Sequence, residues 1–149
     1  MKYPTIFLAF LMLFSGCTTV PSTKDQLIQS RISSQKYCYT GPLSEIAQRL
    51  RSYLSACYRP ITVSGSTVAA GVFIPVQSNI DWSVEEEAIA SGTRFTVTGL
   101  GKYVLAAQVT GPEQACSTTL QAYAGNQIWT NRFETLDKVA RNQKAECPY

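Results

Sequence analysis

The chain has 149 residues, of which 13 are basic and 10 are acidic, and it contains no histidine. This length suits a single domain, and the weak, dispersed charge excludes a nucleic-acid groove or a polybasic membrane patch. The lack of histidine removes the commonest general base, the usual catalytic triads and most zinc sites. We therefore expect no cofactor, no metal and no nucleic-acid partner.

The chain opens with an uninterrupted apolar run from Ile6 to Phe14, closed by Ser15, Gly16 and Cys17. A membrane-spanning helix needs roughly 20 apolar residues, so this run is too short to cross a bilayer. A weakly basic start, a short apolar core and small residues at its end are typical of a secretory signal.

The segment Phe14-Ser15-Gly16-Cys17 resembles the lipobox of bacterial lipoproteins, although that family prefers leucine where this chain has Phe14. The resemblance covers residues 1–17 only. It implies that residues 1–16 are a cleaved signal peptide and that Cys17 carries fatty-acyl chains such as palmitate in the lipid bilayer. An Asp after the cysteine retains enterobacterial lipoproteins in the inner membrane. Thr18 at that place implies the outer membrane, with the domain facing the periplasm.

Four cysteines remain after Cys17, and an even number in an exported chain predicts two disulfides. A four-thiolate zinc site is disfavoured because the cysteines are widely spaced. Three pairings are possible. We favour Cys116 with Cys147, because a helix that returns along the last strand brings them to the same level. That choice leaves Cys38 with Cys57.

Residues 17–36 are predicted to be the lipidated cysteine and a flexible tether, with an end-to-end distance of about 25 Å. A short helix from Asp25 to Ile32 is the competing interpretation. The first confident helix begins near Pro42 and ends before Arg59-Pro60, because the residue before proline avoids helical angles. Its apolar stripe turns Cys57 inward.

Period-two alternation and turn residues predict about five strands in residues 61–123, joined by short connections into an antiparallel meander. The predicted segments are 61–63, 72–74, 82–89, 94–98, 103–109 and 116–123. A second amphipathic helix covers 129–142. The sequence therefore predicts one α+β domain, residues 37–149, a two-layer sandwich with both helices on the same sheet face. The last strand, tryptophan-led helix and terminal cysteine resemble a pattern among small uncharacterised outer-membrane lipoproteins, which implies no biochemical role.

Few residues in this chain point to chemistry. Asp81 with Glu85, Glu86 or Glu87 is a possible carboxylate pair, but charges that protect a solvent-facing edge strand explain them better. Gly99-x-Gly101 lacks the third glycine of a dinucleotide site and predicts a hairpin turn. Trp82 with Arg94 is the candidate ligand-binding pair, because Trp82 starts a strand with no periodic apolar partner.

We therefore expect a membrane-anchored, non-enzymatic accessory or interaction module of the bacterial cell envelope, with an envelope protein as its partner. The alternative is a binding module for a glycan, peptidoglycan or a lipid, of which a lysozyme inhibitor is a narrower variant. An enzyme would need a carboxylate pair in a cleft with one raised pKa, and ranks third.

Overall fold

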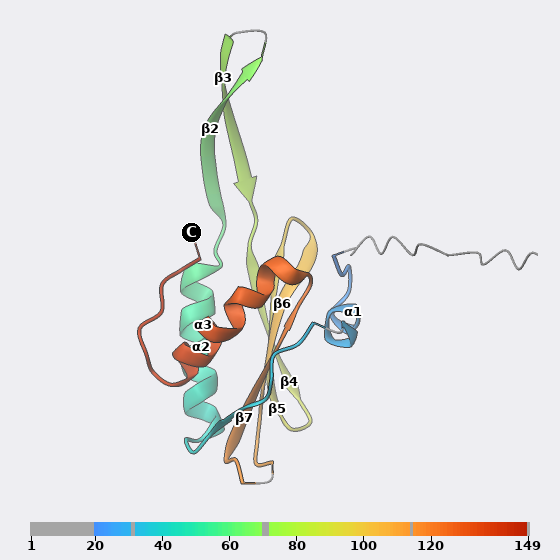
Figure 1. Ribbon diagram of the computed structural model, residues 1–149, viewed down its shortest axis with the longest axis vertical. Coiled ribbons are helices and arrows are strands. Elements are labelled where there is room, and N and C mark those ends of the chain that lie inside the picture. The colour runs from blue at the N-terminus through green and yellow to red at the C-terminus, as the bar shows by residue number, and fades with distance from the viewer. Residues whose placement is uncertain (1–19, 31, 70–71, 114, 149) are drawn as a thin grey trace, which may run out of the picture.

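The computed structural model describes residues 20–30, 32–69, 72–113 and 115–148. The predicted signal peptide and Cys17 lie outside these residues. The fold is α+β, as predicted, and its centre is a five-stranded antiparallel sheet in the order β1-β7-β6-β5-β4 (Figure 1). Its strands are β1 (Tyr37–Tyr39), β4 (Ser83–Ile89), β5 (Gly92–Gly99), β6 (Lys102–Thr110) and β7 (Thr118–Ala124). The predicted Gly99–Gly101 turn joins β5 to β6, with positive φ at Leu100 and Gly101 as type I′ hairpins require.

One face of this sheet carries the core. Helix α2 (Leu43–Cys57) and helix α3 (Arg132–Ala140), which follows the 3₁₀ turn η1 (Gln127–Asn131), pack on it side by side. The strands contribute their alternate apolar residues, which include Phe95, Val97, Leu105 and Leu120, all at most 1% exposed. Both helices therefore cover the same sheet face, as the sequence predicts.

The other face is covered at one end by helix α1 (Lys24–Gln29), which packs on β6 and β7. Leu27 of this helix is fully buried, and Lys24 reaches Glu85 of β4 at 2.6 Å. The segment that follows extends the sheet, since Ser34 N–H donates to the Ala122 carbonyl at 2.8 Å. A flexible tether over 17–36 is therefore wrong for residues 20–30 and 32–36, because one leucine and a short ladder fasten them to the domain.

The hairpin of β2 (Ile61–Ala69) and β3 (Val72–Ile80) forms a second, separate sheet, and it projects beyond the end of α2 (Figure 1). The predicted meander placed these strands in the main sheet, which is wrong. Each strand has 9 residues, whereas the predicted segments 61–63 and 72–74 have three residues each. Serine, threonine, glycine and asparagine interrupt the apolar alternation in the rest of each strand, so that pattern does not reveal its full length.

Two disulfides form, as predicted, but both favoured pairings are wrong: the bonds join Cys38 to Cys116 and Cys57 to Cys147. β1 lies antiparallel beside β7, with Cys38 opposite Thr119, and this brings Cys38 next to the segment that leads into β7. The chain after α3 runs back along α2, where Tyr53 Oη donates to the Glu146 carbonyl at 3.0 Å. Cys147 therefore meets Cys57, which is buried at the end of α2 as predicted.

Across the described ranges, no helix is both long enough and apolar enough to cross a membrane.

Candidate functional site

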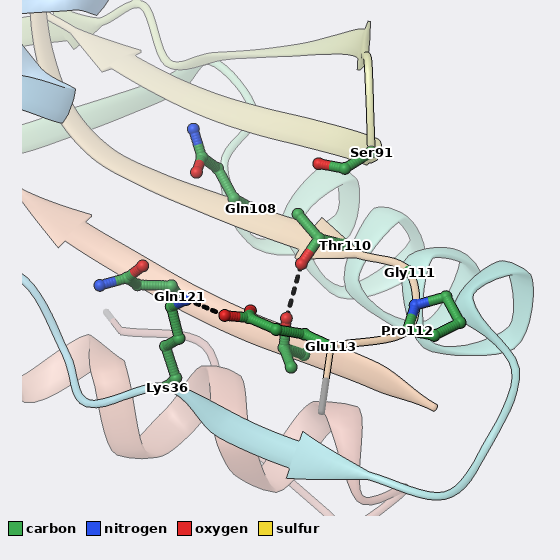
Figure 2. Close-up of a pocket in the computed structure, with 9 residues that line it drawn as sticks. Lys36, Ser91, Gln108, Thr110, Gly111, Pro112, Glu113 and Gln121 are labelled. Atoms are coloured by element: carbon green, nitrogen blue, oxygen red, sulfur yellow. Dashed lines mark hydrogen bonds and ion pairs between the residues drawn. The ribbon is translucent and has the colours of Figure 1, made fainter. Parts of the chain in front are cut away.

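The uncovered part of the second sheet face is a polar hollow of about 440 Å³ (Figure 2). Alternate residues of β6 and β7 form its floor, namely Gln108, Thr110, Thr119 and Gln121. The ion pair between Lys36 Nζ and Glu113 Oε1, at 2.6 Å, joins the residue before β1 to the β6–β7 connection at its rim. The hollow therefore offers amide, hydroxyl and charged groups to a ligand.

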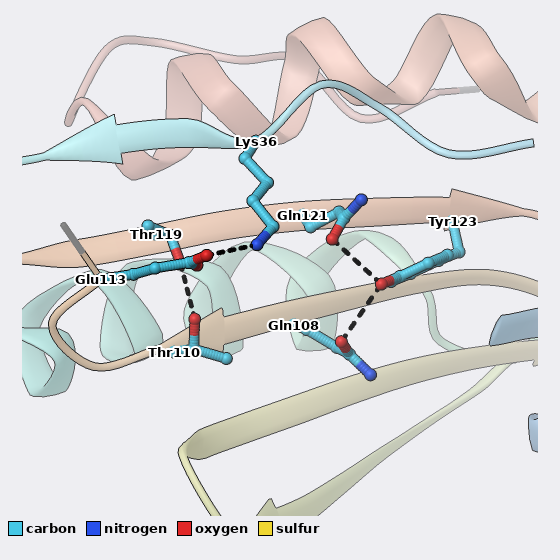
Figure 3. Close-up of polar contacts among 7 residues, drawn as sticks. All are labelled: Lys36, Gln108, Thr110, Glu113, Thr119, Gln121 and Tyr123. Carbon is cyan, nitrogen blue, oxygen red and sulfur yellow. Dashed lines mark hydrogen bonds and ion pairs between the residues drawn. The ribbon is translucent and has the colours of Figure 1, made fainter. Parts of the chain in front are cut away.

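Tyr123 lies beside Gln108 and Gln121 on this face (Figure 3). Its hydroxyl donates to Gln121 Oε1 at 3.1 Å, and burial raises the pKa of this phenol above 10, which keeps the proton in place. Gln108 lies between Tyr123 and Arg94. When the Gln108 amide is oriented with its oxygen toward Arg94, this oxygen accepts hydrogen bonds from Nε and Nη2 of Arg94, at 3.0 Å each. This orientation satisfies both side chains, because a guanidinium has only donors.

The three glutamates of β4 are all paired with basic side chains. Glu85 and Glu87 lie on the polar face with Lys24, at 2.6 and 3.7 Å, and Glu86 lies on the opposite face with Arg51. The pairing with Arg51 lowers the pKa of the Glu86 carboxyl below its ordinary value. β4 is an edge strand of the main sheet, as predicted for these charges.

Trp82 belongs to an aromatic cluster at the root of the β2–β3 hairpin. Its ring centroid lies 5.8 Å from that of Tyr58 and 5.5 Å from that of Trp129, both edge-on. The ring also covers Gly99, where an added Cβ would lie 2.1 Å from it, so only glycine leaves room there. Trp82 therefore serves to hold the two ends of the hairpin against the domain.

The predicted ligand pair of Trp82 and Arg94 is not brought together. Trp82 precedes β4 at the end where Gly99 closes β5, whereas Arg94 pairs with Glu87 near the other end of the same two strands. Five residues of strand separate the level of Gly99 from that of Arg94, or about 16 Å. Arg94 instead borders the polar face, where it lies 3.6 Å from Glu87.

The β2–β3 hairpin projects from the rest of the fold (Figure 1), and residues 61–80 contain no charged side chain. Val63 is 47% exposed, Phe73 75% and Val76 42%. The register places Val63 and Val76 on one face of the hairpin together with Ile61 and Ile80, which are half-buried at its root. An exposed, uncharged arm of this kind is typical of a surface that contacts another molecule.

Sequence reasoning missed both features. The alternation of Gln108, Thr110, Thr119, Gln121 and Tyr123 within two strands is the signal that predicts a polar sheet face. The uncharged stretch of residues 61–80 is the signal for the hairpin. In the part of the chain that the structure describes, no group of three or more Cys, Asp or Glu residues is placed to hold a metal ion.

No protein-family model matches this chain, and neither the curated proteins nor the solved structures contain a match.

Proposed function

We propose that this chain is a lipid-anchored, non-enzymatic interaction module of the bacterial cell envelope, with the β2–β3 hairpin as its contact arm. The observation that carries the proposal is the hairpin itself. It is long, uncharged and exposed, and its apolar residues include Phe73 at 75% exposure. An isolated two-stranded hairpin is at best marginally stable in water, so contact with another molecule would stabilise such an arm.

The N-terminus and the disulfides both support a location outside the cytoplasm. The lipobox-like segment before Cys17 supports an anchor in the outer membrane, facing the periplasm. The bonds Cys38–Cys116 and Cys57–Cys147 support an oxidising compartment outside the cytoplasm. The aromatic cluster of Tyr58, Trp82 and Trp129 supports a fixed arm, because it packs both ends of the hairpin against the core.

A photoreactive amino acid in place of Phe73 tests the proposal in intact cells. We expect irradiation to yield a discrete covalent adduct with a protein, a second copy of this chain included. The matched control places the same group at Ile128, which is 77% exposed but lies on η1 of the core domain, and we expect no adduct there. Equal labelling at the two positions, or none at position 73, contradicts the proposal.

The polar hollow favours a second function, a binding module for an envelope glycan. Its amides and hydroxyls match the hydroxyl groups of a sugar, and its volume of about 440 Å³ lies within the range of small-molecule sites. Gln121→Leu removes a central amide, and we expect it to abolish any shift that muropeptides cause in the amide spectrum of the chain. A wild-type spectrum unchanged by millimolar muropeptide refutes this second function.

A further inference from the structure

We propose that the outer edge of β2 pairs with the same edge in a second copy of this chain, which forms a four-stranded antiparallel sheet in the order β3-β2-β2-β3. The inference rests on the proposed function, because it names the partner of the contact arm.

The outer edge of β2 is unprotected, unlike the other edges of this molecule. β4 carries three glutamates, and β1 has only three residues. β3 contains Pro75 in its middle. β2 spans 9 residues with neither a charge nor a proline, and among the described strands it pairs with β3 alone. Since native proteins protect exposed edges with charges, proline or shortness, an open edge of this length indicates a strand partner.

Pro75 decides which edges can meet. It lies opposite Ser66 and has no N–H, so the hairpin loses no bond if this position of β3 faces away from β2. By alternation, the free N–H groups of β2 are then those of Thr62, Ser64, Ser66 and Val68. Pairing of β2 with β3 of the next copy would meet the proline and would propagate head to tail as a ring or an open filament. Pairing of β2 with β2 avoids the proline and closes around a two-fold axis.

Gly65 marks the position of that axis. It is the central residue of β2, its φ lies outside the left-handed range, and an added Cβ would have nothing within 4 Å. Nothing in its own chain therefore requires glycine there. Glycine inside a strand weakens the strand and often marks the close approach of another backbone. A two-fold axis at this residue aligns all of residues 61–69 with their counterparts, Ser64 opposite Ser66.

The chemistry of the arm favours a second copy over a charged partner. Residues 61–80 carry no charge, so two arms approach without repulsion although the whole chain has a net charge of +3. Val63 and Val76 of both copies then lie on one face of a four-stranded sheet. Three or more strands with an apolar face are what an independently stable sheet requires, and the hairpin alone has two.

The substitution Gly65→Cys tests the register directly in the full, exported chain. Opposed residues of a non-hydrogen-bonded antiparallel pair lie about 4.5 Å apart at Cα, which suits a disulfide. We expect at least ten times more disulfide-linked dimer on non-reducing gels than for the control Thr62→Cys. That control lies on the same strand, but its counterpart in the other copy is six residues away, about 20 Å. Equal cross-linking in the two variants overturns the proposal.

A pair of proline variants tests the edge without a new thiol. Ser64→Pro removes an outward N–H of β2, and Gln77→Pro removes an outward N–H of β3, and neither breaks the ladder within the hairpin. We expect sedimentation of the detergent-solubilised chain to show a monomer for Ser64→Pro and a dimer for Gln77→Pro and wild type. A wild-type monomer, a larger ring or filament, or a Gln77→Pro monomer with a Ser64→Pro dimer overturns the proposal.

The photochemical experiment at Phe73 separates this inference from the proposed function. An adduct with a different protein, together with no Gly65→Cys dimer, overturns the two-fold pairing and leaves the interaction module standing. Absence of any protein adduct, with the chain bound instead to neutral phosphatidylcholine vesicles through the arm, overturns both.

Discussion

Leu27→Ala is the most informative substitution outside the hairpin, because it tests whether residues 20–36 belong to the folded domain. Leu27 is fully buried between α1 and the second sheet face. Leu→Ala changes in cores cost about 2–5 kcal/mol, and a short helix at the periphery relaxes more than a core does, so we expect about 3 kcal/mol. The exposed ion pair between Lys24 and Glu85 contributes at most about 1 kcal/mol, so it cannot hold the helix without Leu27.

Urea denaturation with the disulfides intact, followed by tryptophan fluorescence, measures this free energy. The loss corresponds to a melting temperature lower by about 10 °C for a domain of this size. Leu100→Ala is the matched control, since Leu100 is 74% exposed in the β5–β6 turn, and we expect it to stay within about 0.5 kcal/mol of wild type. Leu27→Ala and Leu100→Ala with the same unfolding free energy would show that α1 does not fold with the sheet.

Three further predictions follow from the core. A peptide map without reduction should contain the Cys57–Cys147 peptide pair, and replacement of both cysteines by alanine should lower the unfolding free energy by up to about 4.5 kcal/mol for a loop of 90 residues; a peptide with Cys57 bonded elsewhere refutes the pairing. Burial and the hydrogen bond to Asp137 raise the pKa of the Tyr39 phenol far above 10, so below pH 10 this group adds no pH dependence to the unfolding free energy. Above pH 10 the unfolding free energy should fall with pH, because the phenol ionises only in the unfolded state. Tyr39→Phe should flatten this alkaline fall, and an unchanged fall in the variant contradicts the prediction. Trp82→Ala should cost about 3 kcal/mol and broaden the amide resonances of the hairpin more than those of the main sheet, whereas uniform broadening would show that the tryptophan does not anchor the arm.

The parts of the fold with strong periodicity could be predicted from the sequence. The stripe of α2 and the stripe of α3 identify both helices and the face that each buries, including the inward position of Cys57. Phe95 and Val97 identify β5, because apolar alternation on one side of a half-buried sheet is its clearest signal. The glutamates at positions 85–87 identify an edge strand, because a strand buried in the middle of a sheet does not tolerate three such charges.

The parts of the fold that could not be predicted depend on contacts between residues far apart in the sequence. β1 has three residues and exists only because β7 pairs with it, so no local pattern announces it, and without β1 the Cys38–Cys116 bond could not be foreseen. Leu27 lies alone in a polar segment, and one buried leucine has no periodicity. The polar hollow follows from strand alternation, but the approach of Lys36 to Glu113 does not, because 77 residues separate them.

The Cys38–Cys116 bond also determines how this protein responds to a pull on its N-terminus. Among the described residues, 20–30 and 32–37 precede the crosslink, and Leu27 and a short ladder with β7 hold them on the sheet. Tension would detach this segment from the sheet. The disulfide would then carry the load, and the rest of the sheet would stay intact. Fully extended, residues 20–37 would span about 60 Å, so a load on the N-terminus would lengthen the connection to the domain by up to that distance.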